Sequence, residues 1–200
     1  LKELYLFDNN LTTLPPELGY LHQLQTLGVE GNPLDANLKN IIQKDGTNAL
    51  ICHLRDNYTT QPAPPPRLWK SLLSAPEREA LNADPNAETF SILCFNILCE
   101  KYATEKMYGY TPTWALAWDY RREQITRELL AHDTDVLCLQ EVDIAQYEDY
   151  FTKTLAEHGY SGVFWPKSRA KTMNETDRRT VDGCATFYKH ARCVASSNRP

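Results

Sequence analysis

Leucines recur with a fixed spacing in the first 34 residues of the chain. The first stretch places apolar residues and one asparagine at Leu1, Leu4, Leu6, Asn9 and Leu11. The same spacing returns from Leu24 to Leu34, with Asn32 in the place of Asn9. A single amphipathic helix is the alternative for such leucines, but the prolines at 15, 16 and 33 would break it. The pattern therefore predicts two copies of a short strand followed by a bend.

This spacing is typical of leucine-rich repeats, in which leucines fill a continuous core between successive turns. The asparagine of each repeat bonds to the backbone at the bend, so we predict that Asn9 and Asn32 are buried and hydrogen-bonded. Solenoids of this kind need about three or more repeats. Because Leu1 falls inside the pattern, we expect further repeats before it.

A helical end and a proline-rich stretch follow the repeats. Asn37–Lys44 and Thr47–Asn57 read as two helices separated by Asp45-Gly46, with Thr47 as an N-cap, and they would close the solenoid. Four prolines at 62, 64, 65 and 66 then favour an extended spacer. A ligand for a polyproline-binding domain is the alternative. We assign residues 1–58 to the repeats and 59–88 to the linker.

The pattern changes from residue 89, where strands alternate with helices. Apolar runs predict strands within 89–98, 135–142, 160–165 and 184–189, and helical spacing predicts helices over 114–131 and 145–158. A strand as continuously apolar as Val-Leu-Cys-Leu is expected to be buried on both faces of its sheet. The second domain, residues 89–200, is therefore predicted to be α/β.

Composition narrows the function. A mean hydropathy of -0.51 and the lack of a long apolar run predict a soluble protein without a membrane span. Lys and Arg number 21 against 26 Asp and Glu, for a net charge of -5, so bulk positive charge cannot bind nucleic acid and a local site would be needed. The six cysteines form no C-x-x-C pair and predict small buried residues in a reducing compartment.

Two polar residues stand at the ends of apolar strands. Asn96 interrupts the run around Phe95, and Glu141 ends the run that begins at Val136. A carboxylate at the end of a buried strand needs a partner, and a hard cation such as Mg²⁺ is one candidate. A glutamate simply solvated at the strand terminus is the other.

Four segments carry a resemblance to a known family. FNILCEKYA, WDYRREQI, DVLCLQEVD and KSRAKTMNETDRRTVDGCATFYK resemble the endonuclease/exonuclease/phosphatase superfamily. Within it they are most similar to the carbon catabolite repressor deadenylases, poly(A)-specific 3'-to-5' exoribonucleases that also carry leucine-rich repeats. The resemblance implies the C-terminal end of a repeat solenoid followed by the first half of a four-layer α/β-sandwich nuclease domain.

The resemblance also assigns roles to residues. Glu141 would ligate a catalytic Mg²⁺, and Asn96 would position a phosphate oxygen or the neighbouring acids. Asp177 and Asp182 would lie beside the bound nucleotide, although a turn aspartate before a strand is an equal interpretation of Asp182. Five cations between Lys167 and Arg179 could hold RNA phosphates or form a solvated loop face. The implied reaction is metal-assisted hydrolysis that releases 5'-AMP from poly(A).

The family places a D-x-N segment and an S-D-H segment downstream of VDGCA, and neither occurs between VDGCA and Pro200. We therefore expect a fragment that lacks both ends of its parent and holds half of an active site. By resemblance, the repeats would bind a second nuclease subunit and the scaffold of the deadenylase complex, in the cytoplasm and nucleus. The alternative is a non-catalytic interaction module with a remnant nuclease domain.

Overall fold

The chain divides into two compact units. The computed structural model describes residues 1–58, 65–66 and 68–193. One unit, here the N-terminal unit, comprises Leu1–Gln61 with Leu98–Arg127. The other, the sheet unit, comprises Pro62–Ile97 with Glu128–Pro200. Much of the predicted proline-rich spacer, at 59–64 and 67, lies outside the described residues.

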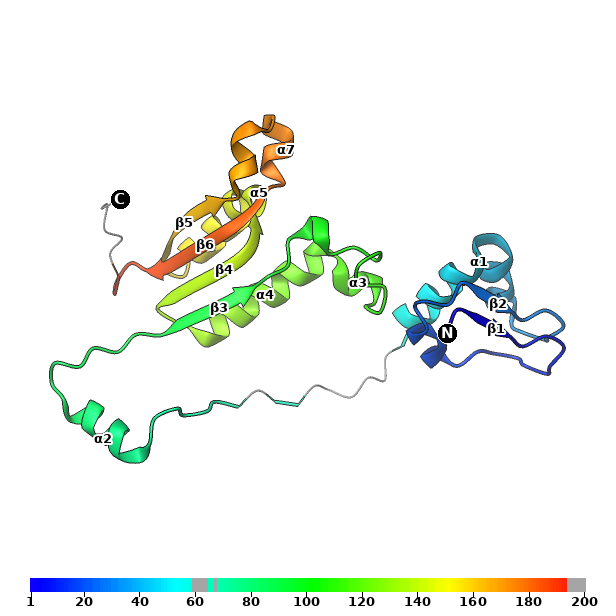
Figure 1. Ribbon diagram of the computed structural model, residues 1–200, viewed down its shortest axis with the longest axis horizontal. Coiled ribbons are helices and arrows are strands. Elements are labelled where there is room, and N and C mark those ends of the chain that lie inside the picture. Colours follow the sequence, from blue (N-terminus) through cyan, green and yellow to red (C-terminus); the bar gives the residue numbers. More distant parts are fainter. Residues whose placement is uncertain (59–64, 67, 194–200) are drawn as a thin grey trace. The chain divides into compact units, whose positions relative to one another are not determined.

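The leucines of the N-terminal unit fill one core. Strand β1 (Glu3–Tyr5) pairs in parallel with β2 (Thr26–Gly28), and a short 3-10 helix, η1 (Pro16–Tyr20), lies between them in sequence (Figure 1). Helix α1 (Ala36–Asp56) packs against η1. The buried core residues come from both leucine stretches and from α1: Leu14, Leu24, Leu27, Val29, Leu34, Leu38, Leu50, Ile51 and Leu54.

Helix α1 contains the predicted break. Gly46 has a φ of 83° and a ψ of -176°, so two helical segments meet there, as the sequence predicts. The side chain of Asp35 caps the first segment by accepting from the Leu38 N–H at 3.0 Å. The hydroxyl of Thr47, expected as the next cap, instead accepts from the Leu27 N–H at 3.1 Å and satisfies a backbone donor of β2.

The two repeated asparagines differ in burial. Asn32 is buried, and its amide donates to the carbonyl oxygens of Leu6 at 2.7 Å and Val29 at 2.9 Å, while its oxygen accepts from the Leu11 N–H. Asn9 also bonds to backbone but is exposed, so its predicted burial is wrong. The reason is that Asn32 reaches Leu6 in the turn before its own, whereas both bonds of Asn9 stay within its own turn.

Residues 98–127 contact the end of α1. They contain a 3-10 turn, η2 (Glu100–Tyr102), the short helix α3 (Thr113–Leu116) and most of α4 (Trp118–His132). Arg55 donates to the Gly109 carbonyl, and Asp56 accepts from the Thr113 backbone at 2.9 Å and from its hydroxyl. The structure therefore groups residues 98–127 with the N-terminal unit, whereas the sequence analysis assigned them to the second domain that begins at residue 89.

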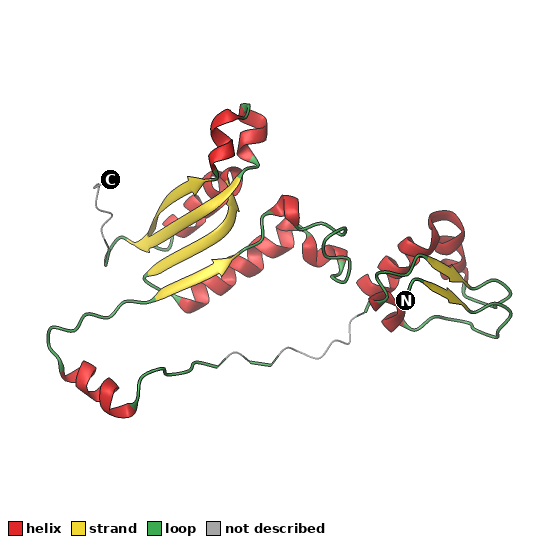
Figure 2. Cartoon of the chain, in the orientation of Figure 1, coloured by secondary structure: helices red, strands yellow, loops and turns green. Residues whose placement is uncertain are grey.

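The sheet unit is built on a mixed four-stranded sheet in the order β3-β4-β6-β5 (Figure 2). Strand β3 (Ile92–Asn96) runs parallel to β4 (Val136–Asp143), β6 (Asp182–Lys189) runs antiparallel to β4, and β5 (Tyr160–Pro166) runs antiparallel to β6. All four predicted strands are confirmed. The remaining elements are α2 (Ala75–Ala83), α5 (Ile144–Gln146), a π-helical turn η3 (Tyr147–Phe151), α6 (Thr152–Ala156), a 3-10 turn η4 (Ser168–Thr172) and α7 (Glu175–Arg179).

Helix α2 lies within the segment predicted as linker. It begins with a capping box, in which Ser74 accepts from the Glu77 N–H and the Glu77 carboxylate accepts from the Ser74 N–H at 2.8 Å. None of its residues is buried. The helix is therefore stabilised by its own cap rather than by packing. No helix in the described part of the chain is long and apolar enough to cross a membrane.

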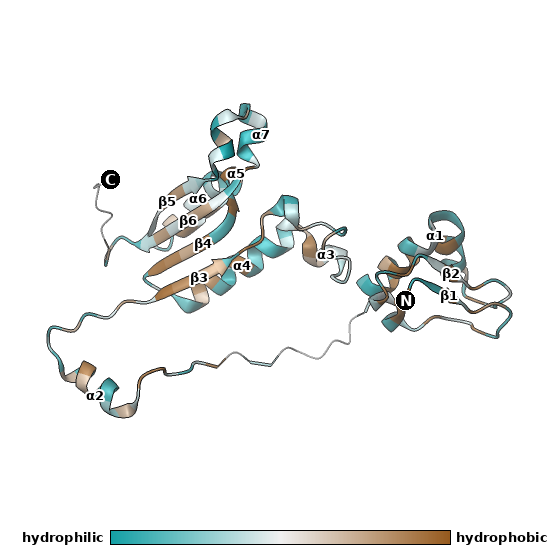
Figure 3. Ribbon diagram, in the orientation of Figure 1, coloured by the Kyte–Doolittle hydropathy of each residue, from teal (hydrophilic) through white to brown (hydrophobic). Residues whose placement is uncertain are grey.

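Only one face of the sheet carries fully buried side chains, so the prediction of burial on both faces is wrong. That face carries Leu137, Leu139, Ala185 and Phe187, and Tyr147 of η3 stacks on Phe164 at 4.8 Å between ring centroids. The other face exposes side chains of three strands: Ile92, Cys94, Val163, Trp165 and Cys184. Cys94 and Cys184 are exposed, so the prediction that the cysteines are small buried residues is wrong for these two. The apolar run of β4, brown in Figure 3, alternates leucines on the buried face with smaller side chains on the other.

A buried carboxylate joins the first residues of the sheet. Asp135 accepts from the backbone N–H of Ser91 at 2.9 Å and from its hydroxyl at 3.0 Å, and the Ser91 Oγ accepts the Asp135 N–H at 2.9 Å. These hydrogen bonds lower the pKa of Asp135, with a smaller contribution from Arg192. Ser91 and Asp135 therefore fix the register at which β3 enters beside β4.

The two asparagines give a matched test of the N-terminal core. We expect Asn32→Ala to lower the free energy of unfolding by about 1–3 kcal/mol, because it leaves buried backbone groups without partners. Asn9→Ala, which removes an exposed side chain of the same type, should cost clearly less. Hydrogen exchange of residues 1–58 measures both effects, and an equal loss of protection in the two variants would contradict this account.

The clamp between Ser91 and Asp135 predicts a pH-dependent stability. Because the folded-state pKa of Asp135 lies below its ordinary value of 3.8, its stabilisation is complete above that pH and is lost as the pH falls through the folded-state value. Ser91→Ala should therefore lower the urea midpoint at neutral pH, and the difference from wild type should shrink on acidification. In an Asp135→Asn background, the effect of Ser91→Ala on the urea midpoint should not change as the pH falls. A change in that background would show that another group titrates.

Candidate active site

The sheet topology brings three of the four candidate residues to one end of the strands. Parallel strands β3 and β4 both end there, at Asn96 and Asp143, and antiparallel β6 begins there at Asp182. Strand β5 also ends there, at Pro166 opposite Gly183. We call this end of the sheet, with the loop that follows β5, the site end.

Asn96 and Glu141 are in direct contact at the site end. The Asn96 amide donates from Nδ2 to Glu141 Oε1 at 2.7 Å. Asn96 is exposed, and Glu141 is half-buried. The bond fixes one carboxylate oxygen and orients the second, so Glu141 can offer an oriented anionic oxygen to a ligand. The contact places Asn96 beside an acidic residue, as the family resemblance implies, and the chemical roles of both residues stay a prediction.

Glu141 occupies a strained backbone position. Gln140 pairs with Cys184 and Val142 with Gly183, so Glu141 is the extra residue of a β-bulge. Its φ is 59°, in the left-handed region that costs a non-glycine residue about 1–2 kcal/mol. Such strain persists only where the surroundings impose it, and it is concentrated at functional sites. No sequence signal marks this conformation, because the residue is not glycine.

Asp182 lies inside the protein rather than on its surface. Its side chain is 1% exposed and pairs with Arg169 at 2.5 Å and with Lys167 at 2.6 Å. The Asp143 residue opposite it in the register is also buried and caps α5 by accepting from the Gln146 N–H. Strand β6 therefore places Asp182 at the site end, near its predicted position. Its carboxylate, however, pairs with two cations of the chain. Any role toward a substrate would pass through them.

Asp177 is exposed and serves as part of a helix cap. The Asn174 side chain accepts from the Asp177 N–H at 2.9 Å and donates to the Asp177 carboxylate at 2.7 Å. In the part of the chain that the structure describes, this carboxylate bonds to Asn174 rather than to Asn96 or Glu141. The structure thus does not join Asp177 to the other candidates.

The basic stretch between residues 167 and 179 is divided among several ion pairs. Arg178 pairs with Glu175 at 3.2 Å, and Arg179 bridges Glu148 at 3.0 Å and Asp149 at 2.5 Å. The charge of Asp149 raises the pKa of Arg179. Arg179 therefore ties α7 to η3. Lys167 and Arg169, by contrast, share the buried Asp182 and stay about half exposed.

The donor chemistry of Glu141 suits a hard divalent cation. Such ions prefer carboxylate oxygens, and Mg²⁺ often binds through one or two carboxylates and substrate phosphates. Among the described residues, no group of three or more His, Cys, Asp or Glu is placed to hold a metal ion. Within the described residues Glu141 supplies one carboxylate donor, which Asn96 orients, and does not complete a metal site by itself.

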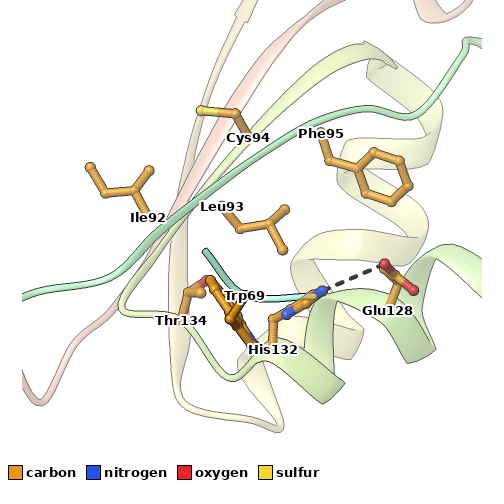
Figure 4. A pocket seen from close by; sticks show the side chains of 8 residues that line it. All are labelled: Trp69, Ile92, Leu93, Cys94, Phe95, Glu128, His132 and Thr134. Carbon is orange, nitrogen blue, oxygen red and sulfur yellow. Dashed lines mark ion pairs between the residues drawn. The ribbon is translucent and has the colours of Figure 1, made fainter. Parts of the chain in front are cut away.

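A cavity of about 290 Å³ lies elsewhere in the sheet unit (Figure 4). Its walls are residues 92–95 of β3, the end of α4 and Trp69. His132 pairs with Glu128 at 3.5 Å, and Trp69 meets the His132 ring edge-on at 5.9 Å. Neither Asn96 nor Glu141 lines the cavity, so it is separate from the candidate site.

Comparisons with known proteins identify relatives of the sheet unit and of most of the chain. The model of the Endonuclease/Exonuclease/phosphatase family matches residues 93–198. The chain is 55% identical over 171 residues to the CCR4-Not complex 3'-5'-exoribonuclease subunit Ccr4 of Mycosarcoma maydis, covering 83% of this chain and 25% of that protein. It is 45% identical over 258 residues to the subunit of the same name from Schizosaccharomyces pombe, covering 97% and 37%. The chain thus spans between 25% and 37% of the length of these two relatives.

A solved structure also shares part of the sequence. The chain is 32% identical to the human Nocturnin catalytic domain with bound sulfate anion, with a TM-score of 0.38. The match covers 50% of this chain and 32% of that one.

Two variants of Glu141 test the backbone strain at the bulge independently of the carboxylate. Glu141→Gly and Glu141→Ala both remove the carboxylate, but only glycine adopts the left-handed conformation without steric cost. We expect the glycine variant to be more stable than the alanine variant by roughly 0.5–1 kcal/mol, after the greater freedom of glycine in the unfolded chain is counted. Thermal unfolding of the two variants measures this difference. An alanine variant as stable as the glycine variant would show that the bulge relaxes.

Proposed function

Because the chain belongs to the endonuclease/exonuclease/phosphatase family, we propose that it is part of a 3'-5' exoribonuclease that shortens the poly(A) tails of mRNA and releases 5'-AMP. The relatives named as exoribonuclease subunits support this reaction over a non-catalytic module. The observation that carries the proposal is the hydrogen bond of Asn96 to Glu141 at the strained bulge. It gives the site end an oriented carboxylate of the kind that phosphodiester hydrolysis requires.

Nucleases of this family generally depend on a divalent metal ion, and we propose Mg²⁺ with Glu141 as a ligand. When bound, the ion would polarise the phosphate and activate the attacking water. The chain's own residues prepare the site. Asn96 holds Oε1 of Glu141, which fixes the orientation of the carboxylate, and the bulge fixes the backbone that carries it. We place Asp182, and more distantly Asp177, on the nucleotide side of the site.

The N-terminal unit supports the rest of the proposal. Its parallel strands, its leucine core and the Asn32 bonds across two turns fit the C-terminal end of a leucine-rich repeat solenoid. We propose that residues 1–58 form this end, that 59–88 link it to the nuclease domain, and that 89–200 form the first half of a four-layer α/β sandwich. In this proposal the repeats bind a second nuclease subunit and the scaffold of a deadenylase complex, in the cytoplasm and nucleus. The named relatives, subunits of the CCR4-Not complex, support such an assembly.

The reaction is tested in the full-length protein that contains this chain. Glu141→Gln should lower the release of 5'-AMP from oligo(A) with Mg²⁺ by more than 100-fold, because a neutral amide is a poor ligand for the ion. Asn96→Ala should cost about 10–100-fold, the range typical of a residue that orients a metal ligand. Asn9→Ala, far from the site in sequence, is the control and should keep wild-type turnover. Near-normal turnover of Glu141→Gln would refute the assignment.

A further inference from the structure

The pairing of Asp182 with Lys167 and Arg169 is the most buried charge arrangement at the site end. The Asp182 side chain is 1% exposed, whereas the side chains of its partners are 53% and 42% exposed. A buried carboxylate is costly unless it is paired, so it constrains the groups that pair with it. The buried carboxylate therefore holds the charged groups of Lys167 and Arg169 in place.

The backbone of the same loop is fixed to the start of β6. The Lys167 N–H donates to the Asp182 carbonyl at 3.0 Å. Ala170 is buried in a small apolar cluster with Ile144 and Val181. A side chain at Gly183 would lie 2.2 Å from the Trp165 carbonyl oxygen, so only glycine permits this approach. The loop from Lys167 to Thr172 is thus anchored by its backbone, its core contact and its two ion pairs.

Register places this loop beside Glu141. Val142 pairs with Gly183 in β6, and Gly183 pairs with Pro166 in β5, so β4 and β5 are separated by one strand. Two strand spacings of about 4.8 Å give roughly 10 Å between the backbone at the bulge and the backbone where Lys167 follows Pro166. A chain of phosphates with one of them at Glu141 would therefore pass within reach of the two long cationic side chains.

We propose that Asp182 is a positioning residue that holds Lys167 and Arg169 at the site end to bind RNA phosphates next to the one that is hydrolysed. This inference rests on the proposed function and specifies how the site binds its polyanionic substrate. The structure shows two half-exposed cations that share one buried carboxylate. Arg178 and Arg179, in the same stretch, pair instead with the more exposed carboxylates of Glu175, Glu148 and Asp149.

Neutralising Asp182 distinguishes positioning from simple electrostatics. If Asp182 acted only as a negative charge near RNA, Asp182→Asn would remove a repulsion and strengthen RNA binding. If it positions the two cations, the same substitution releases them and weakens productive binding. The two explanations predict changes of KM in opposite directions.

The experiment measures steady-state release of 5'-AMP from an oligo(A) ten-mer with Mg²⁺ in the full-length protein, over a series of salt concentrations. We expect Asp182→Asn to raise KM about tenfold and to change kcat less. Lys167→Gln and Arg169→Gln should each raise KM and reduce the slope of log KM against log salt concentration by about 0.7, the value for one contact to a single strand. Arg178→Gln removes the same charge from a neighbouring pair and should leave the slope unchanged.

Coupling between the variants gives a second measurement. Because Asp182 acts through its partners, Asp182→Asn should add little to the KM of the Lys167→Gln, Arg169→Gln double variant. Should Asp182→Asn fail to fold, the two surface variants still test the phosphate contact. An unchanged or lower KM for folded Asp182→Asn, or unchanged slopes for Lys167→Gln and Arg169→Gln, would overturn the inference while wild-type turnover still supports the proposed function. A wild-type protein that releases no 5'-AMP would overturn both.

Discussion

The antiparallel pairing of β4 with β6, with its single irregularity at Glu141, is the interaction on which the site depends. It sets Asp182 opposite Asp143 and leaves Glu141 unpaired between Cys184 and Gly183. Through β6 it also places the end of β5, and with it the loop at Lys167. The parallel pairing on the other side of β4 brings Asn96 to the same end. A register slip of one residue would turn every side chain to the opposite face and would separate these groups.

The bulge can hold a strained residue because the strand around it is firmly packed. Leu137, Leu139 and Val142 of β4 have no exposed surface, and they fix the backbone on both sides of Glu141. Burying such side chains contributes about 1.5–3 kcal/mol each, which exceeds the cost of one left-handed residue. Packing on the buried face of the sheet therefore stabilises β4 enough to offset the cost of the left-handed backbone at Glu141.

The sequence predicts the parts of this structure that depend on periodicity, and it misses those that depend on three-dimensional neighbours. All four strands and the break at Gly46 follow from local patterns. The contact of Asn96 with Glu141 depends on the parallel pairing of β3 with β4, which the strand patterns alone do not predict. The left-handed backbone of Glu141 has no local signal. Likewise, the exposure of Asn9 and the uncovered face at Trp165 depend on which segments lie alongside. An apolar run shows that a strand prefers burial but not which of its faces is covered.

Two acidic residues at the site end have different environments, and this difference separates their roles. Glu141 is half-buried and held through one oxygen, so its other oxygen stays available to a ligand. Asp182 is buried and pairs with two half-exposed cations, so it acts on the surface through Lys167 and Arg169. This arrangement matters for the proposed RNA substrate, because the net charge of -5 gives the chain an overall field that repels a polyanion. In that proposal the attraction comes from cations fixed close to the reacting phosphate, and a buried carboxylate fixes them without presenting its own charge to the substrate.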